Sequence, residues 1–160
     1  MADEINLGGK LYICATAQAS NLTEVQFEAL TWVEIEQVLT MPSIGETDNF
    51  VSQTYVKDGR ARFKKGVTSG NATEIVVGYD YSDAGQDALA TASASRNIYA
   101  FKRVLTDSPN DVTTTNTIYY FRALVGAGVD SGGAVEDFTN ITYPIQITDQ
   151  APIRVEPEAI

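Results

Sequence analysis

Several long stretches of this chain alternate apolar and polar residues at every second position, which is the repeat of a β-strand with one buried face. The clearest examples are residues 73–81, 117–129 and 141–148. Shorter runs that favour strands occur at residues 10–15, 31–38, 49–57, 60–66 and 96–105. Residues 96–105 are apolar on both faces, which predicts a central strand. Pro144 has no N–H for a neighbouring strand, so the last strand is predicted to lie at a sheet edge.

Two short helices are predicted between these strands. Thr23 and Gln26 have the spacing of a capping box, which predicts that a helix begins there. A second helix is predicted at about residues 83–94, where Ser82 or Asp83 can cap the N-terminus. Its apolar residues form one narrow stripe, so this helix is expected to lie on a sheet. The stripe consists of Ala84, Ala88, Leu89 and Ala92.

The order of these elements predicts the fold class. The strands occur in runs and do not alternate regularly with helices, which favours an antiparallel barrel or sandwich over a parallel α/β fold. At 160 residues the chain is most simply one domain, residues 1–160. We therefore expect a mainly β (β-rich α+β) domain with one substantial helix beside the sheets. No apolar run approaches the roughly 20 residues that cross a bilayer, so no membrane insertion is expected.

The residue types on which most enzymes depend are scarce. The sequence has no histidine, which removes the commonest general base and zinc ligand, and its single cysteine, Cys14, is expected to be a buried apolar residue. It has neither the glycine-rich phosphate-loop motif nor the Gly-x-Ser-x-Gly motif of hydrolases. Asp80, Asp83 and Asp87 lack the spacing of an EF-hand calcium loop. We predict that the chain is not an enzyme and uses no cofactor or metal.

Two pairs of carboxylates are candidates for catalytic groups. Glu34 and Glu36 are two residues apart on a predicted strand, so they share one face and could form a glycosidase-like pair. We favour the alternative that they belong to a solvated or subunit-facing surface. Glu136 and Asp137 are adjacent, and on a strand they would point to opposite faces, which makes them a poor acid–base pair.

Nearly half of the basic residues lie in nine consecutive positions of an acidic chain, whose formal net charge is -10. They are Lys57, Arg60, Arg62, Lys64 and Lys65, around an Asp58-Gly59 pair typical of a hairpin turn. Three interpretations are open: a solvated hairpin, a nucleic-acid patch, and a self-association arm. Tight DNA binding is unfavourable, because affinity for phosphates comes from lysine and arginine, whereas the chain as a whole is acidic. We favour the arm, because a basic hairpin on an acidic domain is complementary to other copies of the chain.

Three stretches resemble the major tail tube proteins of long-tailed (siphovirus-type) bacteriophages, a family related in fold to contractile-tail and type VI secretion tube proteins. The first is FEALTWVEIEQVLTMPSIGETDN, residues 27–49, and the third is the strand NIYAFKRVL, residues 97–105. The second is KKGVTSGNATEIVVGYDYSDAGQDALATA, residues 64–92. It is the most specific, because a Lys-Gly step leads through a strand into a helix that starts with Asp-x-Gly-Gln.

The resemblance implies a structural subunit. The implied fold has two packed antiparallel sheets in a sandwich or split barrel, a flanking helix at about 83–94, and a long hairpin arm at about 43–66. The implied assembly is a ring of six copies, and stacked rings form a hollow tube whose acidic lumen conducts DNA at ejection. The arm and an extended C-terminal tail, at about 149–160, are expected to reach neighbouring copies.

The resemblance also suggests roles for particular residues and partners. The expected inter-subunit contacts are Lys57, Arg60, Arg62, Lys64 and Lys65, and the candidate lumen-facing acids are Glu34, Glu36, Glu136 and Asp137. The implied partners are other copies of the chain, tail tip and terminator proteins, the tape measure protein during assembly, and DNA in transit without specific binding. The implied location is the virion tail, after synthesis and assembly in the bacterial host cytoplasm. A tail terminator or completion ring protein and a non-viral monomeric β-barrel binding module are the alternatives.

Overall fold

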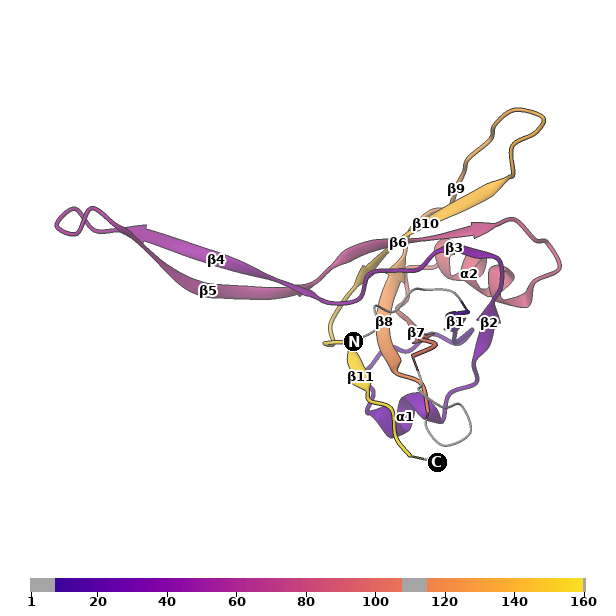
Figure 1. Ribbon diagram of the computed structural model, residues 1–160, viewed down its shortest axis with the longest axis horizontal. Coiled ribbons are helices and arrows are strands. Elements are labelled where there is room, and N and C mark those ends of the chain that lie inside the picture. The colour runs from indigo at the N-terminus through magenta and orange to yellow at the C-terminus, as the bar shows by residue number, and fades with distance from the viewer. Residues whose placement is uncertain (1–7, 108–114, 160) are drawn as a thin grey trace.

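The computed structural model describes residues 8–107 and 115–159 and consists mainly of β-strands (Figure 1). In chain order the elements are β1 (Lys10–Ile13), α1 (Glu24–Glu28), β2 (Val33–Ile35), β3 (Val38–Thr40), β4 (Glu46–Thr54), β5 (Ala61–Gly70), β6 (Ala72–Gly78), α2 (Ala84–Ala94), β7 (Tyr99–Val104), β8 (Ile118–Val125), β9 (Val129–Asp130), β10 (Asn140–Ile147) and β11 (Ile153–Val155). The predicted mainly β fold is confirmed, with one large antiparallel sheet, a second two-stranded sheet and a flanking helix.

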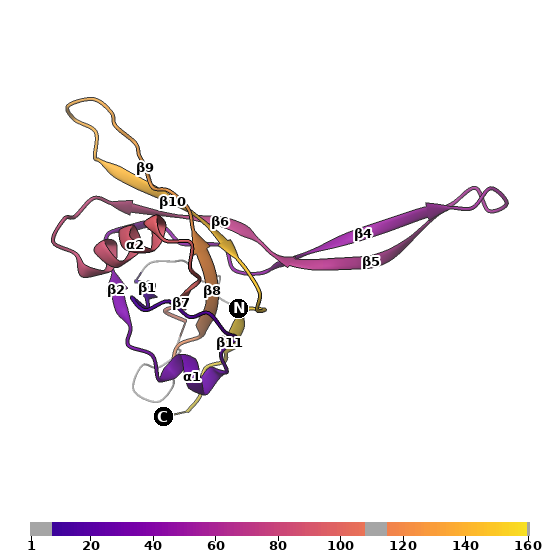
Figure 2. The ribbon, with the colours of Figure 1, turned by 180° about the vertical axis from the view of Figure 1, so that it is seen from behind.

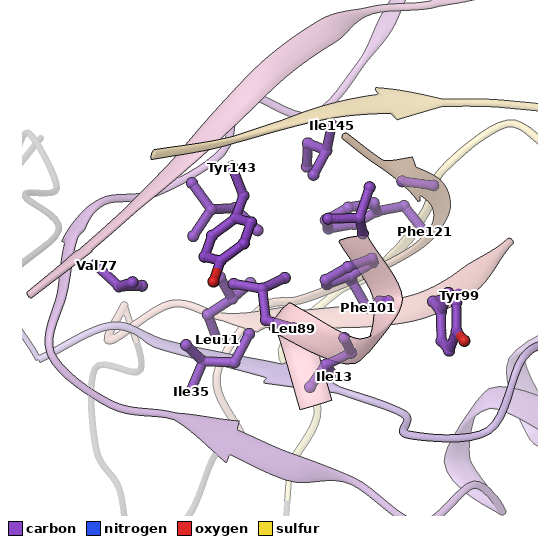
Figure 3. Packing of buried hydrophobic residues seen from close by; sticks show 14 of the residues in the cluster. Leu11, Ile13, Ile35, Val77, Leu89, Tyr99, Phe101, Phe121, Tyr143 and Ile145 are labelled. Carbon is purple, nitrogen blue, oxygen red and sulfur yellow. The ribbon is translucent and has the colours of Figure 1, made fainter. Parts of the chain in front are cut away.

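Nine strands form the large sheet. Its main path runs β2-β1-β7-β8-β10-β6-β3, with β11 paired to β8 and β9 paired to β10. Successive strands align apolar residues on the inner face, as where Ile13 pairs with Phe101 and Phe101 pairs with Phe121. The sheet curls on itself, as shown by Ile35 near one end and Val77 near the other, which belong to the same buried cluster (Figure 3). The result is a split barrel whose main core lies inside the curl.

Helix α2 covers the main core on the open side of this curl. Its Leu89 is fully buried among residues of the inner sheet face (Figure 3). Asp83 caps the helix as predicted, because its carboxylate accepts hydrogen bonds from the N–H groups of Gly85 and Gln86, each at 3.2 Å. Gly85 brings the helix close to β2: a β-carbon at this position would lie 2.0 Å from the carbonyl oxygen of Glu34. The Asp-x-Gly-Gln sequence therefore caps the helix and allows it to contact the sheet.

Replacing Gly85 with alanine is expected to destabilise the fold, although alanine favours helices. The added methyl group must push α2 away from Glu34, and overpacking of this kind costs about 1–3 kcal/mol, which exceeds the gain of about 0.5–1 kcal/mol in helix propensity. Thermal unfolding followed by circular dichroism should therefore occur at a lower temperature. Gly45→Ala is the matched control, because a β-carbon there meets nothing within 4 Å. Equal stability of the two variants would contradict the close-approach explanation.

A second, smaller core lies on the opposite face of the sheet, under helix α1. Phe27 of the helix stacks on Tyr120 of β8 with ring centroids 5.2 Å apart, and Cys14 is buried beside them as predicted. The predicted capping box is also confirmed. The N–H of Thr23 donates to Oε1 of Gln26 at 2.9 Å, and the N–H of Gln26 donates to Oγ1 of Thr23 at 3.3 Å.

The edge position expected for the strand that contains Pro144 was wrong. Strand β10 is not at an edge, because it lies between β8 and β6. The carbonyl of Pro144 accepts a hydrogen bond from the N–H of Gly126 at 2.7 Å, in the gap between β8 and β9. The nitrogen of Pro144 faces the same gap, because the N and C=O of one residue point to the same side of a strand. No ladder donor is required at this gap, so the proline is tolerated there. Within the C-terminal tail expected at about 149–160, residues 153–155 form strand β11 and pair with β8.

Candidate assembly surface

Strands β4 and β5 form a two-stranded hairpin that projects from the large sheet (Figures 1 and 2). The predicted Asp58-Gly59 turn is confirmed, since the N–H of Gly59 donates to the carbonyl of Tyr55 at 3.0 Å and Gly59 has a positive φ of 59°. None of the buried apolar residues of the described chain belongs to this hairpin. Its backbone ladder and turn therefore hold it together without a core of its own.

The hairpin carries large apolar side chains that face solvent. They are Phe50, Val51, Tyr55, Val56, Phe63 and Val67. Val56 is fully exposed and Phe63 is 67% exposed. Soluble monomers rarely expose apolar groups in such a concentration, and where they do the surface usually binds another molecule.

The five basic residues surround the hairpin instead of forming one patch. Arg62 and Lys64 lie on one face, because their partners in the ladder are Gln53 and Val51. Lys65 lies on the other face opposite Phe50, while Lys57 and Arg60 lie at the turn. Positive charge is thus available on both faces and at the tip.

Two of these basic residues form ion pairs within the hairpin itself. Arg62 forms an ion pair with Asp58 at 2.7 Å, and Lys65 forms one with Asp48 at 3.0 Å. A hydrogen bond from Thr68 and then one from Lys65 lower the pKa of the Asp48 carboxyl below its usual value. Within the part of the chain that the structure describes, the other three form no ion pair: Lys57, Arg60 and Lys64.

An apolar groove lies on the large sheet at the base of the loop that joins β9 and β10. It is lined by residues 37–39, 78–80 and 138–140. The side chains of Leu39, Tyr79 and Phe138 are exposed there, with 87% of Phe138 accessible. Gln86 fixes one side of this groove. Its amide nitrogen donates to the carbonyls of Gly78 at 2.8 Å and Glu36 at 3.1 Å, and its Oε1 accepts from the N–H of Asp80 at 3.1 Å.

The four acids predicted to face a lumen are found at separate places. Glu34 lies on β2 opposite Tyr12, whereas Glu36 follows the end of that strand. Glu136 and Asp137 were expected on a strand, which is wrong, because both lie in the loop between β9 and β10. Asp137 closes this loop by accepting a hydrogen bond from the N–H of Ala134 at 2.8 Å.

One face of β6 and β10 is covered by no other element among the described residues. In the paired register, Glu74 lies opposite Pro144 and Val76 lies opposite Thr142, on the side away from the core. Glu74 and Pro144 are exposed. The alternation in the sequence predicts that these residues lie on the face opposite the buried apolar ones. It does not reveal that this face is left open to solvent.

The described residues contain no cluster of metal ligands and no helix that could span a membrane. Among them, no group of three or more His, Cys, Asp or Glu side chains is placed to hold a metal ion. Neither helix of this part of the chain is long and apolar enough to span a bilayer. The exposed apolar side chains of the hairpin and of the groove make these two features the candidates for binding.

The chain matches one known protein family over most of its length. Residues 15–148 match the family described as phage tail tube protein, TTP. The fold is similar to that of the SPP1 tail tube, solved by solid-state NMR and cryo EM, with a TM-score of 0.63 and 15% identity over 96% of this chain and 80% of that one. A type six secretion system protein also matches, with a TM-score of 0.45 and 16% identity over 94% of this chain and 93% of that one. No protein with a curated description matches the sequence.

Proposed function

The chain belongs to the phage tail tube protein family, and from this premise we propose that it assembles into six-membered rings that stack into a hollow tube through which DNA passes. The protein is a structural component of the virion tail. Tail tip and terminator proteins, and a tape measure protein during assembly, are its further proposed partners. Assembly in the host cytoplasm belongs to the same proposal.

The observation that carries the proposal is the projecting β4–β5 hairpin. It has exposed apolar side chains and basic groups that form no ion pair among the described residues, whereas the chain as a whole is acidic. A surface that complements a different surface of the same molecule makes a head-to-tail contact, which closes into rings or continues into filaments. Both edges of the hairpin also lack a neighbouring strand within the described residues, so adjoining copies can extend it.

The open face of β6 and β10 is the better candidate for the lumen wall. It carries Glu74 among mostly polar and small side chains, whereas Glu34 lies on β2, and Glu36 and Asp137 lie next to residues that line the groove. A DNA conduit has to avoid holding phosphates, and a wall without lysine or arginine meets that requirement. The ladder-paired part of this face, residues 72–78 and 140–147, contains no basic residue.

Electron microscopy of the purified protein tests the proposal directly. At high concentration, negatively stained samples are expected to show hollow tubes with regularly repeating rings. Single rings that never stack would favour the terminator or completion-ring alternative. A protein that stays monomeric at every concentration would overturn the proposal and favour a monomeric binding module.

A further inference from the structure

We propose that the tip of the β4–β5 hairpin of one copy docks into the apolar groove between β3 and the base of the β9–β10 loop of a second copy. This inference rests on the proposed self-assembly and names the surface that receives the hairpin. The groove is defined by Leu39, Tyr79 and Phe138, and the hairpin tip is defined as residues 55–64.

The groove has the apolar character that such a contact requires. Leu39 is 62% exposed, Tyr79 58% and Phe138 87%, although all three adjoin regular strands of a well-packed sheet. The hairpin tip presents matching side chains, since Tyr55, Val56 and Phe63 also face solvent. Burying aromatic and aliphatic groups against one another is the main source of affinity at protein interfaces.

Charge complementarity selects the hairpin as the occupant. Asp80 lines the groove, while Glu36 and Asp137 directly precede the lining residues Gln37 and Phe138 in the chain. Residues 36–40, 78–80 and 136–140 contain no lysine or arginine. The hairpin tip brings Lys57, Arg60 and Lys64, which form no ion pair within the described chain. Acidic side chains around the apolar groove attract basic side chains around the apolar tip when two copies meet.

The contact has to be made between copies. The hairpin projects away from the body of its own subunit, and the groove lies beside the β9–β10 hairpin, which points in a different direction (Figures 1 and 2). A chain therefore cannot place its tip in its own groove. Each copy offers one tip and one groove, so the contact is heterologous and can propagate from copy to copy.

A pair of engineered cysteines tests the docking. Val56→Cys places a thiol at the tip and Leu39→Cys places one in the groove, both at exposed positions, while Cys14 remains buried. On mild oxidation of assembled protein, the double variant is expected to give a ladder of covalent multimers in non-reducing gel electrophoresis. Each single variant is expected to stop at the dimer at most, because it has only one accessible thiol.

The matched control moves the second thiol to another exposed valine. Val25 is 73% exposed on α1, at the end of the molecule away from the groove (Figure 1). Val56→Cys with Val25→Cys should give no ladder, and a ladder as long as that of the test pair would overturn the proposal. Val56→Cys with Phe138→Cys serves as a second test pair in case the Leu39 substitution itself prevents assembly.

The results separate this inference from the function on which it rests. If tubes form but neither test pair gives a ladder, the docking is wrong and the tube subunit stands. If the unchanged protein forms no tubes, the proposed function fails first. A ladder in either test pair, without one in the control, supports the docking.

Discussion

Reversing two charges on the hairpin, Arg60→Glu and Lys64→Glu, is expected to give a folded protein that no longer assembles. Neither residue forms an ion pair among the described residues, whereas Arg62 and Lys65, which form ion pairs within the hairpin, are left unchanged. Glutamates at these positions would face an acidic partner. Like charges brought together at an interface cost several kcal/mol, and a loss of about 3 kcal/mol corresponds to roughly a 100-fold weaker contact.

Sedimentation together with electron microscopy measures the lost assembly, and circular dichroism verifies the fold. Lys10→Glu with Arg96→Glu is the matched control, because it also reverses one lysine and one arginine, both exposed and outside the hairpin. The control should still form tubes. If neither double variant forms tubes, the change in net charge causes the loss of assembly, and the hairpin contact does not. If the hairpin variant assembles as well as the unchanged protein, the arm hypothesis is wrong.

Replacing Phe101 with alanine is expected to be the most damaging single change to the fold. Phe101 is fully buried in the main core and stacks on Phe121 with ring centroids 5.3 Å apart (Figure 3). Truncating a buried phenylalanine removes apolar contacts and leaves a cavity, which costs about 3–5 kcal/mol. For a chain of this size the melting temperature should fall by roughly 10 °C.

Assembly would hide part of this effect, because binding between copies stabilises the folded state. The measurement is therefore made by thermal unfolding in the Arg60→Glu, Lys64→Glu background. Phe138→Ala is the control: its side chain is 87% exposed, so the stability of the monomer should not change. A similar loss for both variants would show that the assignment of the core is wrong.

Local patterns predicted most of the elements correctly. Period-two alternation identified the strands that became β6, β8 and β10, because each has one buried face. The cap at Asp83 and the capping box at Thr23 identified the two helices, since these signals act within four residues. The Asp58-Gly59 turn identified the hairpin for the same reason.

Features that depend on distant residues were not predictable. Position 122 lies in an alternating strand, yet Arg122 is fully buried, because its guanidinium donates to the carbonyl of Gln18 at 2.7 Å and to Oδ1 of Asn21 at 2.8 Å. The interior position of β10 follows from its pairing with β6 and β8, which the sequence around Pro144 does not reveal.

The candidate site was predictable only in part. The run of basic residues pointed to the hairpin, because charge that is clustered along a sequence remains clustered in a hairpin. The groove is made from three segments far apart in the chain, 37–39, 78–80 and 138–140, and no local pattern marks them. Glu136 and Asp137 were misplaced because the chain leaves the sheet at Gly132 and Gly133, which both have positive φ.

The absence of a core in the β4–β5 hairpin has a consequence for the timing of assembly. Two-stranded ribbons without a packed face are only marginally ordered in water. When the first copies bind one another, the entropy lost in ordering this segment therefore lowers their affinity. Early encounters are then short-lived, whereas a formed tube end already holds an ordered ribbon and captures the next copy more readily. Growth should therefore be nucleated, with a delay that added tube fragments abolish in light scattering; unchanged kinetics would contradict this. Under the proposed function, nucleated growth would let subunits accumulate during synthesis without polymerising at random.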